Sequence, residues 1–254
     1  MTAIWQGHKT YRVRGTALAA IVAVCVAALA YAGNAVTLWV VYLGTDRAIV
    51  SGDVDAVTSL EGSWSVTQLA AGVTEAVALT LTIVWMWRAR KNLDAFPDAR
   101  PVLSAGWAIG GWFLPVANAV IPARMMVNLA RESTKEAWVR AVAVVWWLAL
   151  VVHMAGDRLV ANASINRAVD LNTWYGPDEL DVWADHYRQW ALDATWLGVV
   201  GVIAAVCFGL VVLWISDGQE SRIARGQYED DLRVMGITPP AAGPPAAGGA
   251  TIGA

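Results

Sequence analysis

The stretch that decides the fold is residues 16–43, TALAAIVAVCVAALAYAGNAVTLWVVYL. It contains no charged residue. It is also longer than the roughly 20 apolar residues that a helix needs to cross a bilayer core about 30 Å thick. A basic stretch precedes it, and Ala28-Leu29-Ala30 resembles a signal-peptide cleavage site. The apolar run continues well past that site, beyond the roughly 7–15 residues of a signal sequence, so we predict an uncleaved membrane span.

Three further runs have the same character, at residues 66–87, 137–155 and 191–215. Hydrophobic residues make up 57% of the chain and charged residues 15%, against about 45–50% and 25% in an ordinary soluble domain. The net charge of −3 provides no basic surface for nucleic acid. We therefore predict an all-α, polytopic membrane protein with four transmembrane helices. Three Lys against 15 Arg, with abundant Ala, suggest a bacterial plasma membrane.

Residues 103–122, LSAGWAIGGWFLPVANAVIP, are apolar but contain three Gly and two Pro. Such a segment either crosses the membrane with a kink or enters it and returns. If it returns, 14 of the 18 basic residues lie on the cytoplasmic side, as the positive-inside rule requires. We therefore predict four spans, a re-entrant or interfacial element over residues 103–136, and both termini in the cytoplasm.

This topology divides the chain into three parts. Residues 1–15 form a cytoplasmic N-terminal segment, and residues 16–215 form the membrane domain, with outer loops at 44–65 and 156–190. Residues 216–254 form a cytoplasmic tail. Its Pro/Ala/Gly-rich end cannot bury a core, so we expect it to be disordered.

After Pro122, apolar residues recur every four positions, while Arg124, Arg131 and Lys135 lie on the opposite face. A basic amphipathic helix beside a membrane is typical of a helix that lies on anionic headgroups. The alternative is a plain cytoplasmic connecting helix.

Glu75 is the one charged residue in the second run. An ionisable group at mid-membrane is costly, so it should face the bundle interior. Gln68 shares its helical face, and the estimated depth of Asn34 makes it a plausible partner. The residues form either a proton or cation site, or a structural hydrogen bond between helices.

Other chemistry has little support. His153 and Asp157 share a helical face, and with His186 they make three potential metal ligands, but no HExxH or paired-Cys pattern accompanies them. No nucleotide-binding or nucleophile motif occurs either. We expect no enzymatic activity, no cofactor and no metal.

Two motifs resemble a known family. Residues 85–92, WMWRARKN, include Trp87, Arg88, Arg90 and Asn92 and resemble a signature that ends a transmembrane helix. Residues 106–118, GWAIGGWFLPVAN, resemble the core motif of the same family. The motif residues of this second half are Gly106, Trp107, Trp112, Phe113, Pro115 and Asn118, followed by Pro122. The chain is thus similar to the domain of unknown function 4328 family of bacterial, mainly actinobacterial, membrane proteins. The resemblance implies no catalytic residue.

Two functional hypotheses follow. In the first, the WFLPVAN element and the basic helix bind a membrane-protein partner or anionic lipid at the cytoplasmic side. In the second, the chain forms a small oligomeric channel or transporter that uses Glu75 and the broken helix, because transporter sites combine these features.

Overall fold

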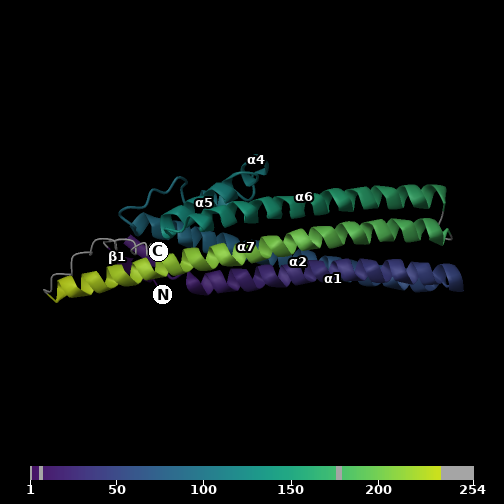
Figure 1. Cartoon of the computed structure of the whole chain (residues 1–254), viewed down its shortest axis with the longest axis horizontal. Coiled ribbons are helices and arrows are strands. Elements are labelled where there is room, and N and C mark those ends of the chain that lie inside the picture. The colour runs from purple at the N-terminus through teal and green to yellow at the C-terminus, as the bar shows by residue number, and fades with distance from the viewer. Residues whose placement is uncertain (1, 6–7, 176–178, 236–254) are drawn as a thin grey trace, which may run out of the picture.

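The computed structural model describes residues 2–5, 8–175 and 179–235. Four long helices lie side by side along one axis (Figure 1). They are α1 (Arg14–Ser51), α2 (Val54–Asn92), α6 (Ala137–Trp174) and α7 (Leu180–Val234). Each contains a stretch long and apolar enough to span a membrane, and each stretch covers one predicted span. The prediction of an all-α protein with four membrane-spanning helices is confirmed.

The four helices form two antiparallel hairpins. Gly52 ends α1 in the left-handed region, with φ of 73°, and its N–H bonds to the Ala48 carbonyl, which is the conformation that glycine adopts without a steric penalty. Helix α1 packs against α2 and α7, and α7 packs against α6. Within the described residues, α2 and α6 are not packed against each other. Helix α5 (Ile121–Ser133) contacts both of these helices.

The segments that we assigned to outer loops, residues 44–65 and 156–190, are largely helical, and the apolar spacing of Leu180, Trp183, Tyr187 and Trp190 is that of a helix. Residues 44–51, 54–65, 156–174 and 180–190 are helical and extend the four helices beyond the predicted spans. The reason is that these polar segments still bury side chains on one face, among them Ala48, Leu171 and Tyr187. Packing of this face against the neighbouring helices keeps the segments helical after the hydrophobic run ends.

The connection between α2 and α6 starts and ends at the same end of the bundle, which we call the α5 end (Figure 1). It comprises η1 (Leu93–Ala95), α3 (Trp107–Gly110), α4 (Pro115–Asn118) and α5 (Ile121–Ser133). Trp147 Nε1 donates a hydrogen bond to the Ala119 carbonyl, at 3.2 Å. Trp147 lies about 15 Å along α6 from its first residue, at 1.5 Å per residue. Residues 103–120, which we call the re-entrant segment, therefore lead from the α5 end to the level of the middle of the predicted third span, and α5 leads back.

The two ends of the chain differ from the prediction. The N-terminal segment begins with an antiparallel hairpin of β1 (Thr2–Trp5) and β2 (His8–Tyr11), which the sequence analysis did not foresee. The backbone N–H groups of Val13 and Arg14 donate to Glu220 on α7, so this segment lies beside the C-terminal part of α7. The first part of the predicted tail is helical as far as Val234. The end predicted to be disordered lies outside the described residues.

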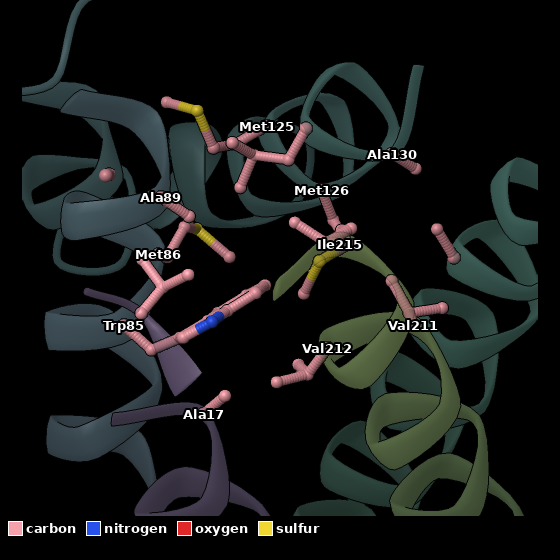
Figure 2. Packing of buried hydrophobic residues seen from close by; sticks show 14 of the residues in the cluster. Ala17, Trp85, Met86, Ala89, Met125, Met126, Ala130, Val211, Val212 and Ile215 are labelled. Carbon is pink, nitrogen blue, oxygen red and sulfur yellow. The ribbon is translucent and has the colours of Figure 1, made fainter. Parts of the chain in front are cut away.

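The largest buried cluster lies at the α5 end, where residues of α5 and of all four long helices come together (Figure 2). Trp85 and Met86 of α2 meet Met125 and Met126 of α5 and Ile215 of α7. All five are fully buried. Burial of such side chains stabilises a fold by about 1.5–3 kcal/mol each, so this cluster fixes α5 and the re-entrant segment to the bundle.

Candidate functional site

A cavity of about 150 Å³ lies in the middle of the bundle. Residues of all four long helices and of the re-entrant segment line it. Its polar side chains include Tyr31 on α1, Glu75 on α2, Asn118 on α4 and His153 on α6. Among the described residues that line it, Glu75 is the one carboxylic acid, and there is no Lys or Arg. The predicted carboxyl group thus faces the bundle interior, as its cost in lipid requires.

The partner of Glu75 is Tyr31, whose hydroxyl donates a hydrogen bond to the carboxylate at 2.7 Å. The predicted pairing of Glu75 with Asn34 is therefore wrong. The Asn34 side-chain oxygen accepts a hydrogen bond from Thr67 at 3.3 Å instead. Because α1 and α2 run antiparallel, Asn34 lies opposite residues near the start of the predicted second span, and Tyr31, one turn earlier, lies opposite Glu75.

Gln68 lies on the same side of α2, two turns from Glu75. Its Oε1 is buried without a hydrogen-bond partner in the described part of the chain. A buried amide oxygen of this kind costs free energy unless something supplies a donor. Gln68 and Asn34 therefore belong to a polar seam between α1 and α2, but they do not belong to the Glu75 hydrogen bond.

His153 completes the polar wall of the cavity. Its Nδ1 lies 2.9 Å from the Leu197 carbonyl oxygen, and because a carbonyl only accepts, Nδ1 carries the hydrogen. Its ring meets the Tyr31 ring edge to face, with centroids 4.8 Å apart. The hypothetical metal set is not assembled, since no three His, Cys, Asp or Glu side chains among the described residues are grouped for a metal ion.

The re-entrant segment contributes an aromatic donor to the cavity. Trp112 lines it, and its indole Nε1 is enclosed without a hydrogen-bond partner among the described residues. Trp112 meets Trp147 edge to face at 6.1 Å, and Trp146 and Phe208 form a tilted pair at 5.8 Å. The cavity therefore combines one carboxyl group, one unpaired indole donor and several aromatic faces.

The first half of the family motif takes part in a hydrogen-bond network at the α5 end. Asn92 is fully buried. Its amide donates to the Tyr11 carbonyl at 2.8 Å and to Gln219 at 3.0 Å, while its oxygen accepts from the Tyr11 N–H at 2.7 Å. Trp87 packs edge to face on the Tyr11 ring, at 5.3 Å. These two residues join the N-terminal hairpin to α2 and α7.

The arginines of this half act on the neighbouring connection. Arg90 is buried, donates to the Leu103 carbonyl at 2.5 Å and pairs with Asp94 at 2.6 Å. It therefore ties the start of the re-entrant segment to the end of α2. Arg88 is half-buried, and nothing in the structure explains its place in the motif.

The second half of the motif shapes the re-entrant segment. Gly106 precedes α3, Trp107 begins it, and Pro115 begins α4. Pro122 is the second residue of α5 and is buried, where proline fits because its missing N–H has no intrahelical partner. Phe113 is 69% exposed. Most of these residues set backbone direction, whereas Phe113 presents an apolar ring at the surface.

Helix α5 is amphipathic, as predicted, but its apolar face is already occupied. Met125, Met126 and Leu129 are fully buried against the bundle. Asn128, one turn after Arg124, is buried and bonds to the backbone of Arg100 and Val102. The basic residues Arg124, Arg131 and Lys135 are exposed. The helix is thus docked on protein, and only its basic face is free to meet headgroups.

Two residues of the central site were missed by the sequence analysis. Tyr31 was overlooked because a tyrosine in an apolar run reads as packing, although it lies one turn from Asn34 on the same face. Trp112 was noted only as a motif residue, because no pattern in the sequence shows that a returning segment brings it to Glu75.

The four apolar spans, the returning segment and the mid-bundle carboxyl group define a polytopic α-helical membrane protein. The chain belongs to the DUF4328 family, a domain of unknown function whose family model matches residues 45–217. No curated protein and no solved structure matches the chain.

Proposed function

We propose that this membrane protein is a non-enzymatic carrier that binds a small lipophilic cation in the mid-bundle cavity, in exchange for a proton on Glu75. The observation that carries the proposal is that Trp112 of the re-entrant segment lines the same cavity as Glu75. A broken helix and an acid at mid-depth are the features from which transporters build substrate sites.

The composition of the cavity favours a cation. A carboxyl group with no basic side chain beside it is either protonated or paired with a bound positive charge. The rings of Tyr31, Trp112, Trp146 and Phe208 supply the π-faces that attract ammonium groups. A cavity of about 150 Å³ holds a ligand of roughly benzene size. The small volume of the cavity argues against a polyamine. Its single carboxyl group argues against a multivalent metal ion.

The helix arrangement supports entry from the lipid. Since α2 and α6 are not packed against each other in the described part of the chain, a membrane-dissolved ligand has a lateral path between them. The seam that contains Gln68 and Asn34 leads from Glu75 toward the end of the bundle opposite α5, and polar groups along it favour proton movement. Oligomerisation is not required for this cavity.

Flux measurement with a matched cation tests the proposal. The protein is reconstituted in liposomes with an acidic interior, and uptake of radiolabelled N-methylpyridinium, a benzene-sized permanent cation, is followed. Proton release on binding is measured separately in nanodiscs. We expect uptake driven by the pH gradient and its loss in Glu75→Gln, by roughly tenfold or more, because the variant removes one partner of a buried charge pair.

Asp46→Asn is the matched control, since it removes an exposed acid from α1 that does not line the cavity. It should transport as the unmodified protein does. Uncharged toluene should not compete with N-methylpyridinium. Absence of both uptake and binding, or equal uptake by Glu75→Gln, would contradict the proposal.

A second candidate is favoured by the exposed face of the α5 end. Phe113 and Leu114 are exposed beside α5, and Val116 is 86% exposed. Together with Arg124 and Lys135, they offer an apolar and basic surface of the kind that suits anionic lipid. Native mass spectrometry in phosphatidylglycerol nanodiscs tests this, with the triple Gln variant of Arg124, Arg131 and Lys135. Unchanged retention of phosphatidylglycerol in the variant counts against it.

A further inference from the structure

A second and larger pocket lies at the end of the bundle opposite α5. Its volume is about 610 Å³, and it shares no lining residue with the mid-bundle cavity. Leu38 and Val41 of α1 form its floor toward the predicted membrane, and Trp64 of α2, Ser164 of α6 and His186 of α7 contribute to its walls. All four helices extend beyond their predicted spans here, and most of the residues that line the pocket belong to these extensions.

The walls of this pocket are aromatic. Trp64 meets Trp190 edge to face with centroids 4.7 Å apart, which links α2 to α7. On α7, Trp183 and Tyr187 stack at 6.0 Å, and His186 lies between them and Trp190 at 5.3 to 5.9 Å. Aliphatic residues, among them Val57 and Ile165, complete the surface. Such walls suit the apolar body of a ligand.

Two nitrogen atoms at this pocket lack partners. His186 is 4% exposed, and its Nε2 has no hydrogen-bond partner among the described residues. The Nε1 of Trp64 is enclosed and equally unpaired within that part of the chain. An indole N–H only donates, and a neutral imidazole nitrogen donates or accepts. A buried donor without an acceptor costs about 1–3 kcal/mol, so a ligand that supplies an oxygen here gains that free energy.

Charge narrows the class of ligand. Among the residues that the structure describes, no Asp, Glu, Lys or Arg lines the pocket. Arg167, Asp185 and Asp193 line an adjoining groove that shares Ser164, His186 and Trp190 with it. A charged ligand would lose hydration in the pocket without gaining an ion pair. We propose that the pocket binds an uncharged lipophilic molecule with a carbonyl or hydroxyl oxygen, which accepts hydrogen bonds from Trp64 and His186.

Photolabelling of the full chain in nanodiscs tests this inference. The probe is dodecanol with a diazirine in mid-chain, and labelled residues are mapped by mass spectrometry. We expect labels on residues 164–172 and 183–190, competed by methyl undecyl ketone at a concentration roughly 2–10-fold lower than by dodecane, because the ketone adds one hydrogen-bonded oxygen. Dodecanoate and dodecylammonium should compete less than the ketone.

Two variants that replace a nitrogen-containing ring by phenyl test where the ligand oxygen binds. Trp64→Phe and His186→Phe should each reduce the advantage of the ketone over dodecane, whereas Trp174→Phe, at a tryptophan that is 79% exposed nearby, should leave it unchanged. If a variant does not fold, the comparison of the competitors on the unmodified protein still tests the inference. Labels spread over lipid-facing residues, equal competition by ketone and dodecane, or stronger competition by a charged analogue would each overturn the inference.

Discussion

The indole Nε1 of Trp147 donates a hydrogen bond to the carbonyl oxygen of Ala119, at 3.2 Å. This bond holds the end of the re-entrant segment against α6, at the level of the middle of the predicted third span. A backbone carbonyl outside a regular helix is costly at membrane depth unless protein satisfies it. Trp147 therefore satisfies a backbone carbonyl that lies outside the long helices.

Replacement of Trp147 by Phe should loosen the end of the re-entrant segment. The variant keeps the aromatic contact with Trp112 but removes the donor to Ala119, at a cost of about 1 kcal/mol. We expect a cysteine introduced at Val120 to react faster with a membrane-permeant maleimide, in a background in which Cys25 and Cys207 are alanine. Trp138→Phe, on the same helix but paired edge to face with Trp214, is the control. Equal rates in the two variants would show that the bond does not hold this end of the segment.

Asn92 should be among the most sensitive polar positions. Its replacement by Leu removes the donor to Gln219 Oε1 and the hydrogen bonds to both backbone groups of Tyr11. We expect a loss of about 3 kcal/mol in the free energy of unfolding, because the orphaned groups stay buried. Thermal unfolding in detergent measures the change.

A double variant separates the network from simple loss of volume. Asn92→Leu combined with Gln219→Leu should cost less than the sum of the two single variants, since each single variant breaks the same hydrogen bond between the two side chains. Asn162→Leu, at an exposed position of α6, should change little. Strict additivity would argue that the two amides act independently.

Hydrophobic runs predicted four membrane helices because chain length and apolarity decide that question locally. The same runs could not show where the helices end. The residues that extend α6 to Trp174 and start α7 at Leu180 are polar on one face, and only packing between helices keeps them ordered. The N-terminal hairpin was missed for a similar reason, because it depends on Asn92 and Glu220 far along the chain.

The central site was predicted in part. Glu75 stands out in any reading of the sequence, since a charge in an apolar run is rare. Its partner depends on the register between α1 and α2, and a shift of one helical turn separates Asn34 from Tyr31. The approach of Trp112 depends on the return of the re-entrant segment, which no periodicity encodes.

Gly218 should be needed for the contact between α7 and α5. A Cβ at this position would collide with the Ser133 carbonyl oxygen and lie 3.2 Å from its carbon. Because these are backbone atoms, the helices must separate, and we expect Gly218→Ala to destabilise the fold by about 1–3 kcal/mol. Gly198→Ala on the same helix, where a Cβ meets nothing within 4 Å, should be neutral or slightly stabilising. Thermal unfolding of the pair measures the difference, and similar midpoints would refute the close contact.

Glu132 should make the stability of the α5 end depend on pH. Its side chain is 11% exposed. Burial alone would raise the pKa of Glu132, but hydrogen bonds from the Arg100 N–H and the Arg131 guanidinium, with the charges of Arg131 and Arg222, hold it below the ordinary value of 4.5. The folded state therefore favours the carboxylate, and the stabilisation is complete above that ordinary value and lost as the pH falls through the lower folded pKa.

Glu132→Gln should consequently lower the thermal midpoint at neutral pH and have less effect as the solution becomes acidic. Between about pH 6 and pH 3, the curves of the variant and the unmodified protein should converge, because protonation removes the same charge that the substitution removes. Glu136→Gln changes an exposed acid four residues further along the chain and should follow the unmodified protein at every pH. A constant difference between Glu132→Gln and the unmodified protein across this range would mean that the carboxylate charge does not stabilise α5.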